Sequence, residues 1–591
     1  MSAGPALKAR AEAAGILLEP RWGGAPDVPA ATLEALVALL GEAAPQKPAE
    51  PRQAYVPPFL DSARIFGVAL QLYQLRSPRN LGVGDLGDLQ ALIAPFAAAG
   101  ADFIGLNPLH ALFSAEPERA SPFSPSDRCF LNPLIVAVDN VPGYDPAMRE
   151  GIEVPDASEQ VDYTAAAAAK LAILRKIFAV WQAGGRSVPD ADREAAAAHR
   201  AIGGKPLADF ALFEALSHAM VAKGHGAGWP AWPAAYRHID SPEVAAFRAA
   251  NADEVAFHTF LQFVAASQLD AAQAAAENAG MRLGLYLDLA VGTAPDGAAT
   301  WADPALAMRG ARVGAPPDLF SSEGQDWGLA PLSPTVLQER DFAPYRAVMG
   351  AVMGPAGAAR IDHAMGIERL FLIPDDASAL DGAYVKFPGL TDVLVDETHR
   401  HSAIAIGEDL GVVPEGFRER MGARRIFSMR IVPFERDATS MRAPARYPAD
   451  SLACFSTHDI APLEAWWRGD DIAIRRELGG LSAADMARAT RDRQAEKALV
   501  LGLAGLPPAL AAGDLTDDLV VAIHRIAARS GSRMVAIRLE DVVGGRRLVN
   551  LPGTDREHPN WRKTLPLDVA AIAQSARLAR VFNAMAKVRT R

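Results

Sequence analysis

Three short motifs place an acid after a run of small or apolar residues, as expected for a carboxylate at the end of a buried strand. They are Asp362 in "AARIDHAMG", Glu408 in "AIAIGEDLG" and Asp459 in "LACFSTHD". Several acids that converge on one site are typical of glycosidic bond chemistry, in which one carboxylate attacks or stabilises the sugar and another protonates the leaving oxygen. These roles require different pKa values, so the neighbours of each acid matter.

The residues around Asp362 and Glu408 predict different protonation states for the two acids. Arg360 is two residues from Asp362 on the same face of the predicted strand, and its cation is expected to keep the aspartate ionised. Glu408 follows an apolar run, where the loss of solvation raises the pKa of a carboxyl and suits it to donate a proton. Asp409 is expected to point the other way along its strand. We therefore predict an attacking group at Asp362 and a proton donor at Glu408.

Each motif alone also has a purely structural interpretation. An Arg-x-Asp pair at a strand end is often a local salt bridge, and "GEDLG" can be a turn with two solvated acids. Thr457 and Asp459 of "STHD" can cap the helix predicted at "APLEAWW". The occurrence of all three features at the ends of different predicted strands favours catalysis.

Eight strand candidates alternate with longer, mostly helical segments. They begin near residues 65, 103, 282, 358, 403, 425, 452 and 533. Near-continuous apolar strands separated by helices predict a parallel sheet that is buried on both faces, and eight such strands close a (β/α)8 TIM barrel. The alternative is an open doubly wound sheet. The barrel is favoured because its strand ends meet at one mouth, where five acids would converge: Asp288, Asp362, Glu408, Asp459 and Glu540.

The chain divides into a short leading segment and one large domain. Residues 1–45 are predicted to form a helical segment, and residues 46–63 a Pro-rich linker. Residues 64–591 would form the catalytic barrel. About 170 residues separate the second and third strand candidates, too many for one crossover. We therefore predict an inserted, mostly helical subdomain at about 140–265, which would rise over the barrel mouth.

The net charge of −11 argues against nucleic acid or a membrane surface as a partner, because the chain lacks an extended cationic surface. Cys129 and Cys454 are the only cysteines, so neither a disulfide framework nor a paired-cysteine metal site is expected. No stretch approaches the roughly 20 apolar residues of a membrane span, and the N-terminus lacks the apolar core of a signal peptide. The cytoplasm is the expected location.

Metal and cofactor motifs are missing from the sequence. It contains no HExxH and no GxxxxGK[ST], and "GVGDLGDL" lacks the third glycine of a dinucleotide-binding turn. Its twelve histidines do not cluster as ligands. We predict chemistry without a cofactor or a metal.

Sugar recognition needs flat apolar faces and polar groups around the hydroxyls. The loop "GAPPDLFSSEGQDWGL" offers Asp318, Asp326 and Trp327 among turn-forming residues, although a lone Trp is equally compatible with a core position. "NLPGT", which starts at Asn550, is similarly polar and rich in turn residues after a predicted strand. Loops at such places tend to carry binding residues.

Seven motifs, in this order, resemble those of the 4-α-glucanotransferases of glycoside hydrolase family 77, the amylomaltases. They are "SPFSPSDRCFLNPL", "GLYLDLAVGTAPDGAATW", "GAPPDLFSSEGQDWGL", "RIDHAMG", "GEDLGVVP", "STHD" and "NLPGTDREHPNWRK", and the resemblance runs from about residue 64 to 565. It implies a retaining barrel of the α-amylase type that cleaves an α-1,4-glucan and passes the glycosyl unit to the 4-hydroxyl of another glucan or of glucose. Maltooligosaccharides, amylose or glycogen-derived glucans would be its substrates.

The resemblance also implies roles for individual residues. Asp362 would be the nucleophile, Glu408 the general acid and base, and Asp459 the group that stabilises the transition state. The substrate-binding positions would be Arg360 and His458 beside the nucleophile, Asp288 at the donor subsite, Trp327 with Asp326 on the acceptor side, and Asn550, Pro552 and Gly553 along the site.

Two departures from the family pattern stand out. Many relatives carry β-rich domains before the barrel, whereas here the linker leads directly into the first strand candidate. Phe123 of "SPFSP" stands where the family often has Tyr, so a hydroxyl contact is missing there. A glucan hydrolase and a catalytically silent glucan-binding protein are the competing interpretations, and the presence of all three carboxylates argues against the second.

Overall fold

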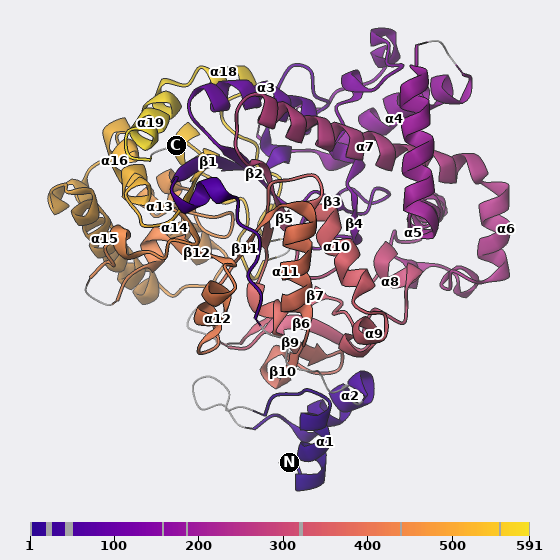
Figure 1. The fold of residues 1–591 in the computed structure, drawn as a ribbon, viewed down its shortest axis with the longest axis horizontal. Helices are drawn as coiled ribbons and strands as arrows, with labels where there is room; N and C mark the ends of the chain where they lie inside the picture. Colours follow the sequence, from indigo (N-terminus) through magenta and orange to yellow (C-terminus); the bar gives the residue numbers. More distant parts are fainter. Residues whose placement is uncertain are drawn as a thin grey trace.

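The computed structural model describes residues 3–18, 27–41, 51–156, 159–184, 187–317, 323–437, 440–554 and 557–589. Its centre is a closed barrel of eight strands in the order β1-β14-β13-β12-β11-β8-β5-β2, all neighbours being parallel (Figure 1). The strands are β1 Ile65–Leu70, β2 Phe103–Leu106, β5 Gly284–Leu289, β8 Ala358–Ile361, β11 Ile404–Gly407, β12 Phe427–Ile431, β13 Ser451–Cys454 and β14 Met534–Arg538. The predicted TIM barrel is confirmed over the open sheet, and each strand coincides with one of the eight candidates.

The barrel interior is filled by alternate residues of the strands. Phe103, Tyr286 and Phe427 belong to this inner cluster. Along each strand, the residues that alternate with the inner ones face the surrounding helices. Room for the large rings comes from small neighbours. A Cβ at Gly67 would lie 2.3 Å from the carbonyl oxygen of Phe103, so only glycine fits there. The apolar runs of the sequence therefore reflect strands that are buried on both faces.

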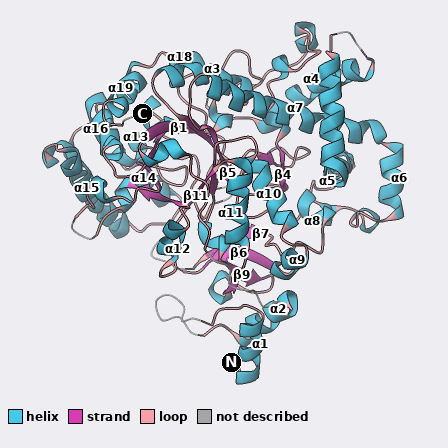
Figure 2. Cartoon of the chain, viewed as in Figure 1, coloured by secondary structure: helices cyan, strands magenta, loops and turns pink. Residues whose placement is uncertain are grey.

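Helices surround the barrel on its outside (Figure 2). Those between and after the strands are α3 Leu86–Ala98, α10 Ala343–Met353, α11 Leu390–His401, α12 Phe417–Ala423, α13 Leu463–Arg468, α14 Asp470–Glu477, α15 Ala483–Ala504, α16 Asp517–Ala528, α17 Leu539–Val543, α18 Val569–Ala573 and α19 Ala576–Ala586. Helices α16 and α19 pack against each other, as do α10 and α11. In the part of the chain that the structure describes, no helix is both long and apolar enough to cross a bilayer.

A large helical region separates β2 from β5 and extends to one side of the barrel (Figure 1). It contains a small hairpin, β3 His110–Ala111 and β4 Asp127–Leu131, and the helices α4 Tyr163–Gln182, α5 Asp190–Ala222, α6 Pro242–Ala250 and α7 Ala252–Asn278. Helix α7 packs against both α5 and the barrel helix α3 and then leads into β5. It therefore belongs to the insertion and to the barrel wall at once, and the predicted boundary at 265 falls inside it.

A second, four-stranded antiparallel sheet lies beside the barrel, in the order β10-β9-β6-β7. Its strands are β6 Ala311–Ala315, β7 Gln325–Leu329, β9 Arg369–Pro374 and β10 Ala383–Lys386, with α8 Ala298–Ala302 and α9 Pro334–Glu339 nearby in sequence. Of the N-terminal helices α1 Pro5–Ala13 and α2 Ala30–Leu40, α2 packs on β9 of this sheet and α1 packs against α2 (Figure 1). Ile16 forms a bridge with Val385, and the Thr32 hydroxyl donates to the carbonyl of Asp381 at 2.8 Å.

Candidate active site

Three neighbouring strands bring four charged side chains to the carboxyl end of the barrel. Asp288 lies in β5, Arg360 lies in β8, and Asp362 and Glu408 directly follow β8 and β11. Asp288 and Arg360 are register partners, and the residues that precede the two other acids are register partners as well. Because β5, β8 and β11 are adjacent in the barrel, the acids predicted from separate motifs share one mouth.

Arg360 stands between two carboxylates. One of its guanidinium nitrogens, Nη1, donates to both carboxyl oxygens of Asp288, at 2.7 and 2.9 Å, and lies 3.0 Å from Oδ1 of Asp362. The predicted pairing of Arg360 with Asp362 is thus present. Asp288 as the closer partner was not predicted, because the sequence gives no sign that residues 72 positions apart are neighbours.

Asp362 remains partly accessible, with 20% of its side chain exposed, whereas Arg360 is nearly buried. Burial raises the pKa of Asp362 to about 6, and the neighbouring Asp288 adds to the rise, while Arg360 opposes it. The guanidinium favours the charged form, as expected, but its effect is smaller than that of burial. The carboxyl is therefore mostly ionised at neutral pH, and it is more basic than an exposed aspartate.

Glu408 is held by the backbone around the nucleophile candidate. Its two carboxyl oxygens accept from the amide nitrogens of Leu410 at 2.8 Å and His363 at 3.0 Å. His363 adopts a left-handed conformation with φ of 45°, which turns the chain directly after Asp362. Burial raises the pKa of Glu408 to about 7, with a further contribution from Asp362. The predicted elevation is in line with this value.

The neighbouring Asp409 is fully buried and has a structural role. Its carboxylate accepts from Nε of Arg418 at 2.6 Å, from the amide of Met429 at 2.8 Å and from Arg430 at 3.3 Å. The two adjacent acids of "GEDLG" therefore serve different purposes, since one faces the mouth and the other ties β11 to β12.

Asp459 lies in the segment between β13 and α13, beside two polar partners. One carboxyl oxygen is 3.2 Å from Nε2 of His458, and the other accepts from the Asn550 side chain at 3.0 Å. Burial acts to raise the pKa of Asp459, but the charge and hydrogen bond of His458 and the hydrogen bond of Asn550 bring it well below its ordinary value. Asp459 thus stays charged at a pH at which Glu408 still holds a proton.

The alternative that "STHD" caps the next helix is wrong. Helix α13 begins at Leu463, and its N-cap residue is Pro462, with no side-chain cap. Thr457 and Asp459 are too far before this helix to serve it. The acid of this motif is therefore free to act at the mouth.

Aromatic rings border the carboxylates on two sides. Phe123, from the loop between β3 and β4, stacks on His458 with ring centroids 4.7 Å apart and also contacts Trp561. Trp327 of β7 meets His363 edge-on at 5.0 Å, next to Asp362. Trp561 was missed by the sequence interpretation, although it belongs to the quoted motif "NWRK". A loop of the helical insertion thus reaches the site, and so does the second sheet.

In the described part of the chain, the remaining predicted binding residues form no side-chain hydrogen bond or ion pair with the three carboxylates, and Asp326 is engaged locally. The Asp326 side chain accepts from Nε of Arg312 at 2.8 Å and from the amide of Gly328, so it braces its own hairpin. Pro552 and Gly553 are exposed in the loop after Asn550. Asp318 lies outside the described residues. The binding roles of these residues stay predictions.

A cavity continues from the mouth into the barrel. It is lined by residues that include Gln71, Asn107, Tyr286, Asp288, Arg360, Ser456, Thr457, His458 and Arg538. Arg538 and Gln71 were not singled out from the sequence. The available signal was a polar residue inside an otherwise apolar strand segment, as in "ALQLYQL" and "VAIRLED".

Among the described residues, no group of three or more His, Cys, Asp and Glu side chains is arranged to hold a metal ion. Cys129 and Cys454 are free thiols.

Comparison with known proteins gives matches over most of the chain. The model of a family described as 4-alpha-glucanotransferase matches residues 70–568. The 4-alpha-glucanotransferase of Haemophilus influenzae is 35% identical over 557 residues, which cover 90% of this chain and 80% of that protein. The 4-alpha-glucanotransferase of Mycobacterium tuberculosis is 37% identical over 536 residues, which cover 86% and 72%.

Solved structures give the same result. The amylomaltase of Corynebacterium glutamicum matches with a TM-score of 0.78 at 30% identity, over 89% of this chain and 76% of that one. The amylomaltase of Streptococcus agalactiae in complex with acarbose matches with a TM-score of 0.72 over 89% and 99%, and at 19% identity this match indicates a shared fold.

Proposed function

Since the chain belongs to the 4-alpha-glucanotransferase family, glycoside hydrolase family 77, we propose that it transfers a segment of an α-1,4-glucan to the 4-hydroxyl of an acceptor glucan or glucose. The observation that carries the proposal is the pair Asp362 and Glu408, which follow register-paired residues of adjacent strands. The pKa is about 6 for the first and about 7 for the second. A retaining double displacement needs this combination of a charged nucleophile and a protonated acid.

In the first half-reaction, the Glu408 carboxyl protonates the glycosidic oxygen while an Asp362 oxygen attacks C1 of the sugar. The bond from C1 to the glycosidic oxygen breaks, a covalent ester between C1 and Asp362 forms, and the rest of the glucan leaves with the proton. Oδ1 of Asp362 faces Arg360, and among the described residues no group bonds Oδ2. Oδ2 is therefore available to the incoming carbon.

In the second half-reaction, the acceptor's 4-hydroxyl replaces the leaving glucan. Glu408, now ionised, takes the hydroxyl proton, the acceptor oxygen attacks C1, and the Asp362 carboxylate is released. Both attacks invert C1, so the product keeps the α configuration. Retention of this kind typically places the two carboxyl groups about 5 to 5.5 Å apart.

Asp459 and its neighbours stabilise the charge that develops on the sugar between these states. Its low pKa keeps it anionic beside the positive anomeric centre, and it also holds ring hydroxyls. His458, which follows β13, and Arg360, in β8, contact the same sugar from different strand ends. Asp288, which Arg360 holds with two hydrogen bonds, contacts the donor sugar.

The acceptor side is formed by the second sheet and the loop after β14. Trp327 offers an aromatic face next to His363, and Asp326 directly precedes it in the same strand. Asn550, Pro552 and Gly553 border the site beside Asp459. Transfer is faster than hydrolysis only if the acceptor sugar is held better than water, which we assign to these residues together with the helical insertion.

Maltooligosaccharides, amylose or glycogen-derived glucans are the proposed donors, and glucose is the smallest acceptor. Incubation of the purified protein with maltotriose tests this assignment. We expect glucose together with a ladder of longer maltooligosaccharides, resolved by chromatography. Products shorter than maltotriose alone would identify a hydrolase, and an unchanged substrate would identify a binding protein.

A further inference from the structure

The segment that carries His458 and Asp459 has neither helix nor strand structure of its own. It runs from Ser456 to Pro462, between the end of β13 and the start of α13. Two side-chain contacts hold the position of Asp459 directly, from His458 and Asn550. Catalysis needs a carboxylate fixed to within a fraction of an ångström, so the backbone of this segment also needs support.

That support comes from Arg538, the last residue of the neighbouring strand β14. Its Nη1 donates to the carbonyl oxygens of Thr457 and Ile460, the second at 2.9 Å, and lies 3.3 Å from the Ser456 hydroxyl. The two carbonyls flank His458 and Asp459 in the sequence. A single buried guanidinium thus fixes the backbone on both sides of the acid.

The residues after Arg538 complete the support. Glu540 lies 3.3 Å from Nε of Arg538, and both groups are almost fully buried. Asp541 accepts from the Ser456 hydroxyl at 2.6 Å and from the amide of Leu463 at 2.8 Å. The motif "RLED" at the end of β14 therefore binds the start, the middle and the end of the Asp459 segment.

We propose that Arg538 is a positioning residue, which sets the location of Asp459 and His458 relative to the nucleophile through the carbonyls of Thr457 and Ile460. This inference rests on the proposed glucanotransferase function. Arg538 also lines the cavity below the mouth together with Asp288 and His458. The competing explanation is that Arg538 only balances the buried charge of Glu540.

Arg538→Lys separates the two explanations. Lysine keeps the positive charge beside Glu540, but its side chain is one atom shorter than that of arginine, so its ammonium cannot occupy the position from which Nη1 reaches both carbonyls. Because a displacement of about 1 Å can lower a rate about 100-fold, we expect kcat with maltotriose to fall about 100-fold, with KM changing less than about threefold. Charge balance alone predicts an unchanged kcat for the folded protein.

A buried arginine elsewhere in the chain supplies the matched control. The Arg589 guanidinium is equally buried and donates to the carbonyls of Ala528, at 3.0 Å, and Ser532, near the end of α16 and away from the mouth. Arg589→Lys is expected to lower the melting temperature and leave kcat unchanged. An equal loss of kcat in Arg538→Lys and Arg589→Lys would overturn the proposal.

A second variant covers the case in which Arg538→Lys does not fold. Arg538→Met combined with Glu540→Gln removes the donors without leaving a buried charge, and the same 100-fold loss of kcat is expected on the scale of such displacements. Normal turnover in the double variant would refute the positioning role.

A glycosyl fluoride donor gives a further readout. Its leaving group needs no proton, so a defect that arises at Asp459 persists with this donor, whereas a defect at Glu408 is largely relieved. We expect Arg538→Lys to remain about 100-fold impaired with the fluoride. Rescue by the fluoride would contradict an action through Asp459. Failure of the wild-type protein to elongate maltotriose would instead refute the underlying function, so the two outcomes are distinguishable.

Discussion

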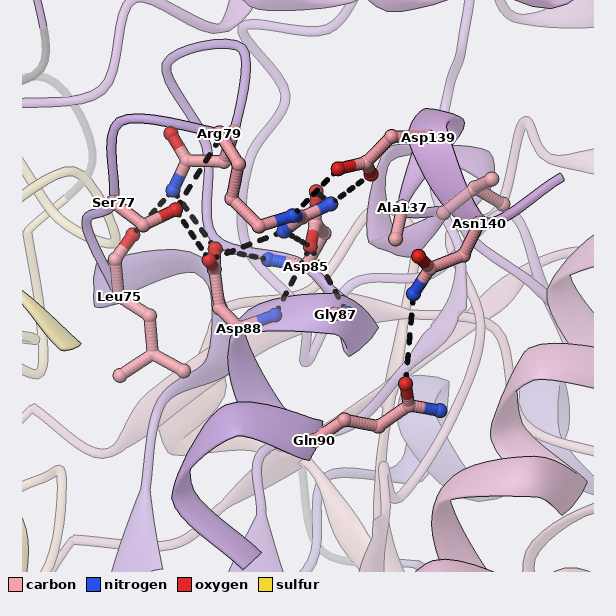
Figure 3. A network of polar contacts seen from close by, with 12 residues as sticks. Leu75, Ser77, Arg79, Asp85, Gly87, Asp88, Gln90, Ala137, Asp139 and Asn140 are labelled. Carbon is pink, nitrogen blue, oxygen red and sulfur yellow. Dashed lines mark hydrogen bonds and ion pairs between the residues drawn. The ribbon is translucent and has the colours of Figure 1, made fainter. Parts of the chain in front are cut away.

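One cluster of acids and cations lies at the barrel mouth, and another lies where α3 begins (Figure 3). The second cluster contains Arg79, Asp85, Asp88, Asp139 and Lys170. Both of its central aspartates are 1% exposed. The residue types are nearly the same as at the mouth, yet only the mouth is arranged for chemistry.

In the α3 cluster, every carboxylate oxygen has a partner within the protein. Asp85 and Asp88 form a capping box at the start of α3, in which the side chain of each aspartate accepts from the backbone amide of the other. Arg79 binds Asp139 through two nitrogens and also reaches both capping acids. Lys170 of α4 adds its ammonium to Asp85 at 3.1 Å. The cluster therefore joins the helical insertion to the barrel and leaves no acceptor for a ligand.

At the mouth, the internal partners are fewer. Oδ2 of Asp362 has no bond among the described residues, and Asp459 keeps 44% of its side chain exposed. The comparison teaches that burial and charge do not by themselves mark a site. What marks it is a carboxylate that is held in place but left with a free oxygen and a shifted pKa.

Asp362→Asn gives the largest expected effect. Removal of the nucleophile should lower kcat for maltotriose disproportionation at least about 10⁴-fold. Burial raises the pKa of Asp362 to about 6, so above this pH the carboxyl is ionised in the folded protein and its charge lowers the free energy of unfolding. A neutral amide should then leave the melting temperature at pH 8 unchanged or higher. Near-normal turnover would show that Asp362 is not the nucleophile.

Asp85→Asn should have the opposite effect, with lower stability and an unchanged kcat. Loss of this carboxylate leaves Lys170 buried without its anion, so the free energy of unfolding is expected to fall by about 3 to 5 kcal/mol. Since the cluster does not touch the mouth, kcat per folded molecule should stay at the wild-type value. Denaturant unfolding and active-site titration measure the two quantities, and a large drop in kcat without lost stability would contradict the division into two clusters.

The pH dependence of kcat/KM should reflect the mouth alone. Activity requires Asp362 ionised and Glu408 protonated, so it should rise with pH through about 6 and fall through about 7. Outside this range we expect a decrease of about tenfold per pH unit. With a glycosyl fluoride donor, which needs no proton donor, the alkaline limb should vanish and the acid limb remain. An alkaline limb that persists with the fluoride would assign it to another group.

Trp327→Ala should produce the smallest effect. Loss of one aromatic face on the acceptor side is expected to lower the ratio of transfer to hydrolysis about fivefold, as a stacking contact of about 1 kcal/mol predicts. Trp327→Phe keeps a ring and serves as the control, with a ratio close to the wild type. The measurement is the yield of maltotetraose and longer products relative to free glucose, and an unchanged ratio in Trp327→Ala would remove this residue from the acceptor site.

The sequence alone predicted the barrel and the three carboxylates. Strands that are buried on both faces must be apolar along their whole length, so eight such segments were visible without any contact information. Closure of the barrel places all the carboxyl ends at one mouth, so the acids after β8, β11 and β13 could be expected near each other. The apolar residues before Glu408 also predicted that its pKa would be raised.

The partners that give each acid its character came only from the tertiary structure. Arg360 shares its guanidinium with Asp288, 72 residues away, and Asn550 reaches Asp459 across 91 residues. Arg538 braces Thr457 from 81 residues farther along the chain. An apolar sequence pattern predicts only which residues are buried. It does not predict which group from a distant part of the chain will lie within hydrogen-bond distance of a given acid. Closure of the barrel fixes those neighbours, and through them the balance of burial and charge that leaves Asp362 a free oxygen.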